Sequence, residues 1–154
     1  MTLRFPYQPV ELLGPPPPSL SSDATARWRP LVPVRVIGPN SFMAFDRAVL
    51  DSGSDDTLFS LPVAERIGAI FLPHAGAHIY RGRTYSIQYA YVQLELTDGN
   101  VLWSWSAVVG LSEAKFRYPL LGQAGCLEFT DVTFKGKDRL VILETNDSYP
   151  GQIS

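Results

Sequence analysis

The segment AVLDSGSDDTLF, Ala48 to Phe59, carries most of what the sequence predicts about fold and site. Small and apolar residues run like a β-strand into Asp51, which is followed by Ser52 and Gly53. A carboxylate at the end of a half-buried strand is costly unless it is paired or hydrogen-bonded. Ser52 offers a hydroxyl, and Gly53 allows a tight turn that brings its N–H to the carboxylate oxygens. The segment therefore predicts a position built for one acid.

Length and composition indicate one globular domain. The 154 residues are 45% hydrophobic and 18% charged, with a formal net charge of −2, so neither a nucleic-acid nor a membrane partner is expected. No run reaches the roughly 18 apolar residues of a membrane-spanning helix, and the N-terminus has no apolar signal segment. The single cysteine, Cys126, excludes an internal disulfide and fits a reducing compartment. A cytoplasmic location is expected.

Prolines divide the chain near its start. The run PPPPSLSSDATA, Pro15 to Ala26, favours an extended polyproline segment. We expect an N-terminal arm and proline-rich linker over residues 1–26, a compact domain over 27–146 and a tail over 147–154. A spacer is favoured over an SH3-type ligand because no basic residue flanks the prolines closely.

Short runs of alternating apolar and polar residues predict strands through the rest of the chain. The predicted strands are LVPVRVI (31–37), FMAFDRAVL (42–50), LFSLP (58–62), YSIQYAYVQLEL (85–96), VLWSWSAVV (101–109), DVTF (131–134) and RLVIL (139–143). Asp98-Gly99 predicts a two-residue hairpin turn, and Gly82 in IYRGRTY predicts a second hairpin tip.

Helices are expected to be few and short. PVAERIG, Pro62 to Gly68, has a proline to start and a glycine to stop one or two helical turns. A second short helix is expected after Gly122. Because the strands are short and regularly spaced, with no βαβ rhythm, the sequence predicts an all-β fold with one or two short helices.

Two groups of chemically capable residues have simpler interpretations. His74 and His78 have the spacing of a helical metal pair, but Pro73 and Gly76 argue against a helix and no third ligand is near. No metal and no other cofactor are therefore expected. Cys126 has apolar neighbours, so a buried structural thiol is favoured over a nucleophile.

The string LDSGSDDT, Leu50 to Thr57, resembles the active-site signature of the retropepsins, the retroviral-type aspartic proteases. That signature runs hydrophobic-hydrophobic-Asp-[Thr/Ser]-Gly-[Ala/Ser]-Asp-Asp-Thr. PLVPVRVIGPN resembles the strand and turn before it, and YPLLGQAGCLEFTDVTF resembles the second hallmark, two apolar residues and a glycine before a C-terminal helix. Order and spacing agree from about Pro30 to Leu143, and the C-terminal part is more similar to bacterial and retroelement members. The resemblance implies the retropepsin-like acid protease fold, closed and barrel-like, with a ψ-loop active site.

The resemblance also implies roles for individual residues. Asp51 would be catalytic, Ser52 would reach across to a partner chain, Gly53 would present its N–H to the catalytic carboxylates, and Thr57 would hold the acidic loop. A peptide or protein substrate would bind as an added strand and contact Asp55, Asp56, Leu58, Ile79, Tyr80, Arg81, Gly82, Arg83 and Leu120. An exposed loop acid is an equal interpretation of Asp56, and plain core packing is an equal interpretation of the apolar members.

Two departures from the family pattern stand out. The family commonly has Gly-Arg where this chain has Gly122 and Gln123, and that arginine braces the first acid after the signature glycine. A glutamine cannot neutralise a carboxylate, so Asp55 is expected to use another cation, with Arg27, Arg29 and Arg35 as candidates. The flap segment HIYRGRTY (78–85) has one glycine and two arginines, whereas the family's flap tip is rich in glycine.

Aspartic proteolysis needs two carboxyl groups, one protonated to donate toward the scissile carbonyl and one ionised to activate water. Two carboxyls in contact cannot both ionise cheaply, so their apparent pKa values split and belong to the pair. Asp51 is the only candidate, because Asp98 sits in a turn and neither Asp131 nor Asp138 precedes Ser/Thr-Gly. The expected protein is therefore a homodimer with Asp51 of each chain at a two-fold axis.

A second hypothesis keeps the same fold without the chemistry. In it the chain is a catalytically weak or inactive dimeric module that binds peptides or supports assembly, and Asp51 is a structural acid. The altered residue at Gln123 and the arginines of the flap favour this alternative, whereas the intact Asp-Ser-Gly favours the enzyme.

Overall fold

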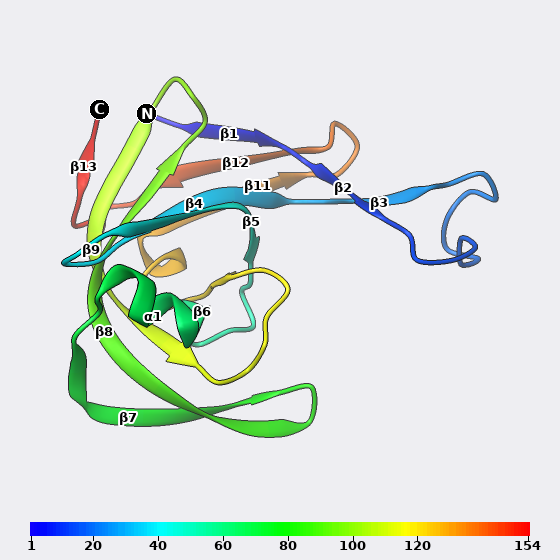
Figure 1. Ribbon diagram of the computed structural model, residues 1–154. Helices are drawn as coiled ribbons and strands as arrows, with labels where there is room; N and C mark the ends of the chain where they lie inside the picture. Colours follow the sequence, from blue (N-terminus) through cyan, green and yellow to red (C-terminus); the bar gives the residue numbers. More distant parts are fainter.

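β-Strands make up most of the chain, and the computed structural model describes all of its residues, 1–154 (Figure 1). The helical elements are one α-helix, α1 (Pro62–Ile67), and one turn of 3-10 helix, Leu127–Phe129. The all-β class expected from the sequence is confirmed. Neither helix has the length and apolar character needed to cross a membrane.

Eight strands form the main sheet. In spatial order they are β13 (Gln152–Ile153), β9 (Leu102–Ser112), β6 (Leu58–Ser60), β10 (Leu120–Leu121), β5 (Phe42–Leu50), β4 (Leu31–Ile37), β8 (Arg83–Thr97) and β7 (Phe71–Tyr80). Because β8 also pairs with β9 along eleven residue pairs, from Ile87↔Ser112 to Thr97↔Leu102, the sheet curls into a partly closed ring. β7 and β13 remain at the edges.

The two-residue strand β10 occupies the position that organises the ring. It runs parallel to β5, with Leu120 opposite Val49, and antiparallel to β6, with Leu120 opposite Leu58. The loop of residues 51–57 joins β5 to β6, so β10 lies between the two strands that this loop connects. The end of β5 therefore lies beside β10 and the residues that follow it.

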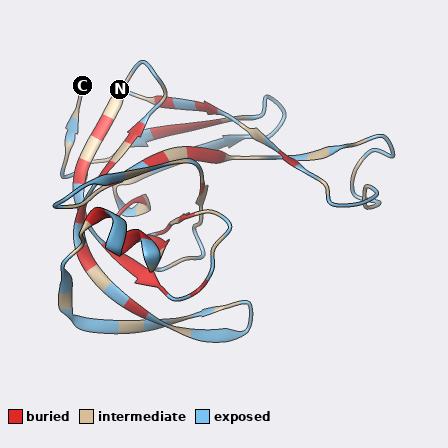
Figure 2. Cartoon of the chain, in the orientation of Figure 1, coloured by how far each residue is buried: buried red, intermediate tan, exposed pale blue.

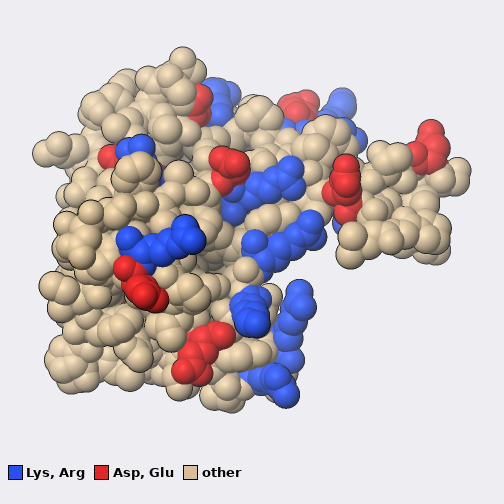
Figure 3. All heavy atoms as spheres, in the orientation of Figure 1, with Lys and Arg blue, Asp and Glu red and all other residues tan.

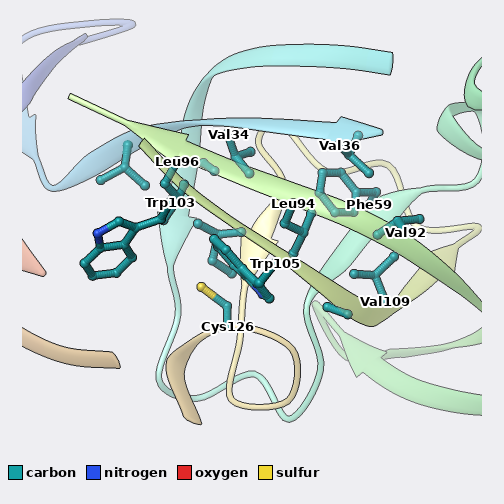
Figure 4. Packing of buried hydrophobic residues seen from close by; sticks show 14 of the residues in the cluster. Val34, Val36, Phe59, Val92, Leu94, Leu96, Trp103, Trp105, Val109 and Cys126 are labelled. Atoms are coloured by element: carbon teal, nitrogen blue, oxygen red, sulfur yellow. The ribbon is translucent and has the colours of Figure 1, made fainter. Parts of the chain in front are cut away.

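Side chains from both sides of the ring fill its interior (Figure 4). Buried positions alternate along β4 and β8, as the period of two requires (Figure 2). Trp103 and Trp105 are 1% and 4% exposed, and the ring of Tyr149 packs against both. Trp105 also donates its indole N–H to the carbonyl of Gly125 at 2.8 Å, which ties β9 to the segment after β10.

The N-terminal residues contribute to this fold in two ways. β1 (Leu3–Pro6) pairs with β12 (Leu140–Thr145), whose other edge pairs with β11 (Thr130–Lys135). Leu3 and Phe5 of β1 are 0% and 4% exposed, so the expected arm contains one strand that belongs to the core. β2 (Gln8–Glu11) and β3 (Ala26–Arg29) form a ribbon that projects from the body, with the proline run near its end (Figure 1). The division at residues 26 and 146 stays a prediction.

Local signals in the sequence have mixed outcomes. The helix at Pro62 is confirmed, and Gly68 ends it in the left-handed conformation at φ 69°. The tip at Gly82 is confirmed as a two-residue turn in which Arg81 also has a positive φ, 50°. The two-residue turn at Asp98-Gly99 is wrong, because β8 and β9 are joined by four residues. The Asp98 carboxylate accepts hydrogen bonds from the N–H groups of Asn100 and Val101, which favours the longer loop.

The contribution of β1 to the core can be tested by truncating its most buried side chain. We expect Leu3→Ala to lower the free energy of unfolding by about 2–5 kcal/mol, because it leaves a cavity in the core. The matched control is Leu13→Ala, at a side chain 99% exposed on the ribbon, which should change stability by less than about 0.5 kcal/mol. Urea denaturation of both variants measures the difference, and equal stabilities would show that β1 does not belong to the core.

Candidate functional site

Asp51 lies where the chain leaves β5 and begins the loop of residues 51–57. Its backbone N–H donates to the carbonyl of Leu121 at 2.9 Å, which fixes it beside β10. Its carboxylate Oδ1 accepts a hydrogen bond from the Gly53 N–H at 3.0 Å, as the sequence predicted. Asp51 is half-buried, whereas Ser52 and Gly53 are exposed. The acid is thus held by its own loop and remains accessible.

Thr57 anchors the other end of this loop. Its side chain is fully buried, its hydroxyl donates to the carbonyl of Ala124 at 2.9 Å, and it accepts from the Gly122 N–H at 3.2 Å. A Cβ at Gly122 would lie 2.1 Å from the carbonyl oxygen of Asp56, so only glycine fits there. The loop and residues 122–124 therefore approach backbone to backbone.

Gln123 braces the loop through its backbone. Its amide Nε2 donates to the carbonyl of Ser52 at 3.0 Å, and its N–H donates to the carbonyl of Ser54 at 2.9 Å. It makes no hydrogen bond with the Asp55 carboxylate, and Asp55 is exposed. The expectation of a cation for Asp55 is wrong within the chain. The one salt bridge joins Arg35 to Glu95, and Arg27 and Arg29 lie on the projecting ribbon.

A cavity of about 480 Å³ opens beside Asp51, between the loop and strand β7. Its lining includes Asp55, Asp56, Leu58, Ile79, Tyr80 and Leu120, which the sequence had placed in contact with a substrate. Arg81, Gly82 and Arg83 are not in the lining, because they form the tip of the β7–β8 hairpin. Of the supporting residues, Gly53 is in the lining, and Ser52 and Thr57 lie outside it. The structure therefore brings the loop and the flap strand around one space.

Asp56, which lines the cavity, is hydrogen-bonded by Tyr89, a residue that sequence reasoning missed. The Tyr89 hydroxyl donates to Asp56 Oδ2 at 2.9 Å. Burial, and then the hydrogen bond and charge of Asp56, raise the pKa of Tyr89 to about 12, so it remains a donor. Asp56 is half-buried, and its interpretation as an exposed loop acid is wrong. Tyr89 is two residues from Ile87 on β8, so the alternation of the strand could have predicted that both side chains face the same side of the sheet.

His78 was also missed as a residue of this site. Its Nε2 lies 2.7 Å from the hydroxyl of Ser112, which is fully buried and accepts from the Ala114 N–H. The rings of Tyr80, Tyr85 and Phe116 surround the imidazole, with centroids 5.9–6.4 Å away. Burial lowers the pKa of His78, and the nearby charge of Asp56 opposes this shift. The imidazole therefore links the flap strand to β9.

Metal and thiol chemistry have no support in the geometry. No group of three or more His, Cys, Asp or Glu side chains in the structure comes together as potential metal ligands. The buried position predicted for Cys126 is confirmed at 1% exposure. Burial, and to a lesser extent Glu128, raise the pKa of its thiol to about 12, so the nucleophilic thiolate is disfavoured.

No protein-family model, curated protein or solved structure matches this chain. A functional conclusion therefore depends on the sequence motif and on the geometry of the site. That geometry presents an accessible carboxylate at the edge of a cavity bordered by strand β7, with Oδ2 free of hydrogen bonds within the chain. Such a group is suited to general acid–base chemistry.

The anchor at Thr57 can be tested with a nearly isosteric substitution. Thr57→Val removes the hydroxyl that serves Gly122 and Ala124 and leaves the Gly122 N–H unsatisfied, which should cost about 1–3 kcal/mol of unfolding free energy. Thr84→Val, at an exposed position of the flap hairpin, is the control and should change stability by less than about 0.5 kcal/mol. Chemical denaturation provides the measurement. A Thr57→Val protein as stable as the control variant would refute the anchoring role.

His78 should titrate below the ordinary histidine value. We expect its imidazole resonances to give a pKa under 6.5, assigned by comparison with a His74→Asn variant. A lowered pKa means that the unfolded chain binds the proton more readily. The stability contributed by His78 is therefore complete above about pH 6.5 and is lost as pH falls toward the folded pKa. A pKa at or above 6.5, or a His78→Asn variant with an unchanged decline in stability, would contradict this account.

Proposed function

We propose that this chain is an aspartic endopeptidase of the retropepsin type, active as a homodimer. The single observation that carries the proposal is the position of Asp51. It ends β5 at the point where β10 is inserted between β5 and β6, within the sequence LDSGSDDT. This insertion fits the ψ-loop arrangement that the resemblance implies. It supports assignment of the retropepsin-like fold to the partly closed ring.

The chemistry requires a second carboxyl beside Asp51. In the proposed dimer, the two-fold axis places the partner's Asp51 next to the Asp51 of the first chain, so that one is protonated and the other ionised. The ionised member removes a proton from water, the water oxygen attacks the scissile carbonyl carbon, and the protonated member donates to the carbonyl oxygen. Collapse of the tetrahedral intermediate then breaks the C–N bond: the carboxyl that took the proton from water passes it to the amine leaving group, and the other carboxylate takes a proton back from a hydroxyl of the intermediate.

The exposed part of the loop supports a two-chain site. Ser52 and Gly53 are both exposed in the single chain. Their backbone is nevertheless hydrogen-bonded, Ser52 to the Gln123 side chain and Gly53 to the Asp51 carboxylate. A rigid exposed loop carrying the acid is well placed to meet its own copy in an isologous contact. Ser52 would then lie at the axis.

Strand β7 supports the expected mode of substrate binding. It is an edge strand of the main sheet, so one row of its N–H and C=O groups has no strand partner. An extended peptide in the cavity would pair with these groups as an added strand, and alternate side chains would face the loop and the flap. The apolar residues Leu58, Ile79 and Leu120 in the lining favour apolar side chains at the scissile bond.

The non-catalytic peptide-binding module remains a second candidate because one specific contact is missing. Asp55 has no cation, and Gln123 holds loop backbone instead. A weakly active or inactive dimer on the same fold would bind the same peptides without cleaving them.

Substitution of Asp51 distinguishes the two candidates. Asp51→Asn can neither activate water nor share a proton, so cleavage of an apolar peptide should fall by at least about 100-fold. The dimer, measured by sedimentation, should remain. Asp131→Asn removes one exposed carboxylate from β11, outside the cavity, and should keep wild-type turnover. Mass spectrometry of peptide products below neutral pH provides the readout. An Asp51→Asn protein with wild-type turnover would disprove the mechanism.

A further inference from the structure

Four cations lie on two segments that meet beside the cavity. Arg81 and Arg83 form the tip of the β7–β8 hairpin, and Lys115 and Arg117 lie in the loop between β9 and β10. The two segments meet through Phe116, whose ring centroid lies 5.0 Å from that of Tyr80 in the cavity lining. Figure 3 shows basic side chains gathered at the lower right, over the end of this hairpin. We call Arg81, Arg83, Lys115 and Arg117 the basic rim.

The basic rim has no acidic partner within the chain. All four side chains are exposed, and the one salt bridge of the structure lies elsewhere, between Arg35 and Glu95. Arg81 lies over the ring of Tyr80 at 5.4 Å, and Arg117 lies over the ring of Tyr118 at 5.2 Å. Aromatic faces orient guanidinium groups without neutralising them. The charge of the basic rim is therefore available to a ligand.

A second cavity extends from the basic rim along β5. Its volume is about 370 Å³, and its lining includes Phe116, Arg117 and Tyr118 together with Arg47. Asp46 is its only acidic lining residue. The two cavities lie near each other, because the ring of Phe116 in this lining contacts the ring of Tyr80 in the lining beside Asp51. A peptide that extends past this ring pair would reach a cavity lined by two arginines.

The floor of the catalytic cavity has the opposite charge. Asp51, Asp55 and Asp56 line it, and none forms a salt bridge. A bound peptide in extended conformation presents successive side chains to opposite faces. Apolar side chains of the peptide can pack against Leu58 and Leu120. Carboxylates of the peptide are repelled by the acidic floor and attracted to the basic rim.

We infer that the basic rim selects peptides in which Asp or Glu residues flank the apolar residues of the cleavage site. Selection of cleavage sites rests on the proposed protease function. The preference in peptide binding does not require it. A peptide is favoured over a polynucleotide because the net charge is −2 and three carboxylates line the adjoining floor. A continuous phosphate backbone would have to pass them.

Binding to the Asp51→Asn protein tests the inference without cleavage. Two fluorescently labelled peptides share one apolar core and differ only in flanking residues, Glu in one and Gln in the other. Near pH 7 and at low salt, fluorescence anisotropy should show the Glu peptide bound about tenfold more tightly, as a few exposed charge contacts provide. The preference should weaken with added salt and as pH falls below about 4, where glutamate is protonated.

Variants of the basic rim locate the effect. Arg81→Gln/Arg83→Gln, and separately Arg117→Gln, should reduce the ratio of the affinity for the Glu peptide to the affinity for the Gln peptide. The matched control is Lys135→Gln/Lys137→Gln, which removes two exposed cations at the turn between β11 and β12 and should keep the full preference. Equal affinity for the two peptides, or an equal loss in the control, would overturn the inference. Tighter binding of a short single-stranded DNA to the basic rim would also overturn it.

Wild-type cleavage separates this inference from the proposed function. Cleavage of both peptides with equal kcat/KM would support the protease and overturn selection by the basic rim. A preference for the Glu peptide in binding, with no cleavage of either peptide by the wild type, would support the basic rim and overturn the protease.

Discussion

The structure depends on the insertion of β10 between β5 and β6. Leu120 pairs with both strands and Leu121 pairs with β5, and together they bring a distant segment against the loop that carries Asp51. The buried Thr57 hydroxyl and the absence of a side chain at Gly122 allow this contact to close. Without it, the loop that carries the acid would be held only at its two ends, by β5 and β6. A preorganised carboxylate needs support of this kind, because catalytic geometry tolerates little displacement.

The supports around the acid differ from those expected of the family pattern. Gln123 holds loop backbone, Tyr89 holds Asp56, and His78 ties the flap strand to Ser112. All three contacts are hydrogen bonds, and only the one from Tyr89 to Asp56 involves a carboxylate. They leave Asp55 without a cation, and they leave the cations of the basic rim without carboxylates. The site therefore has an acidic floor and a basic rim, and acidic residues of a bound peptide would pair with the basic rim.

The sequence predicted those elements whose signal is local. Alternation predicted β4 to the residue, the run of residues leading into Asp51 predicted β5 to the residue, and Pro62 with Gly68 predicted α1. β7 was missed because Pro73 and Gly76 interrupt its pattern; an edge strand tolerates both, since its outer N–H groups need no partner. β1 was missed because four residues next to prolines carry little periodicity, and its burial comes from β12, far along the chain.

In the candidate site, too, residues with a local sequence signal were predicted, and residues placed by distant contacts were not. The motif identified Asp51 and most of the cavity lining, because those residues adjoin one another along the loop and the flap. The contacts of Tyr89 with Asp56 and of His78 with Ser112 join positions 33 and 34 residues apart, and no local pattern encodes them. The wrong expectation for Asp55 had a related cause, because the destination of an arginine side chain is decided by tertiary packing. Arg35 pairs across β4 and β8 with Glu95.

The central claim is that one active site needs Asp51 from two chains. Wild-type and Asp51→Asn chains, mixed in known ratio, unfolded together and refolded, should form dimers at random. If a dimer needs both carboxyls, peptidase activity follows the square of the wild-type fraction, so an equal mixture retains about a quarter of the activity. Activity that falls in proportion to the wild-type fraction, with about half retained in an equal mixture, would contradict a shared dyad. It would show that each active site needs Asp51 from one chain only.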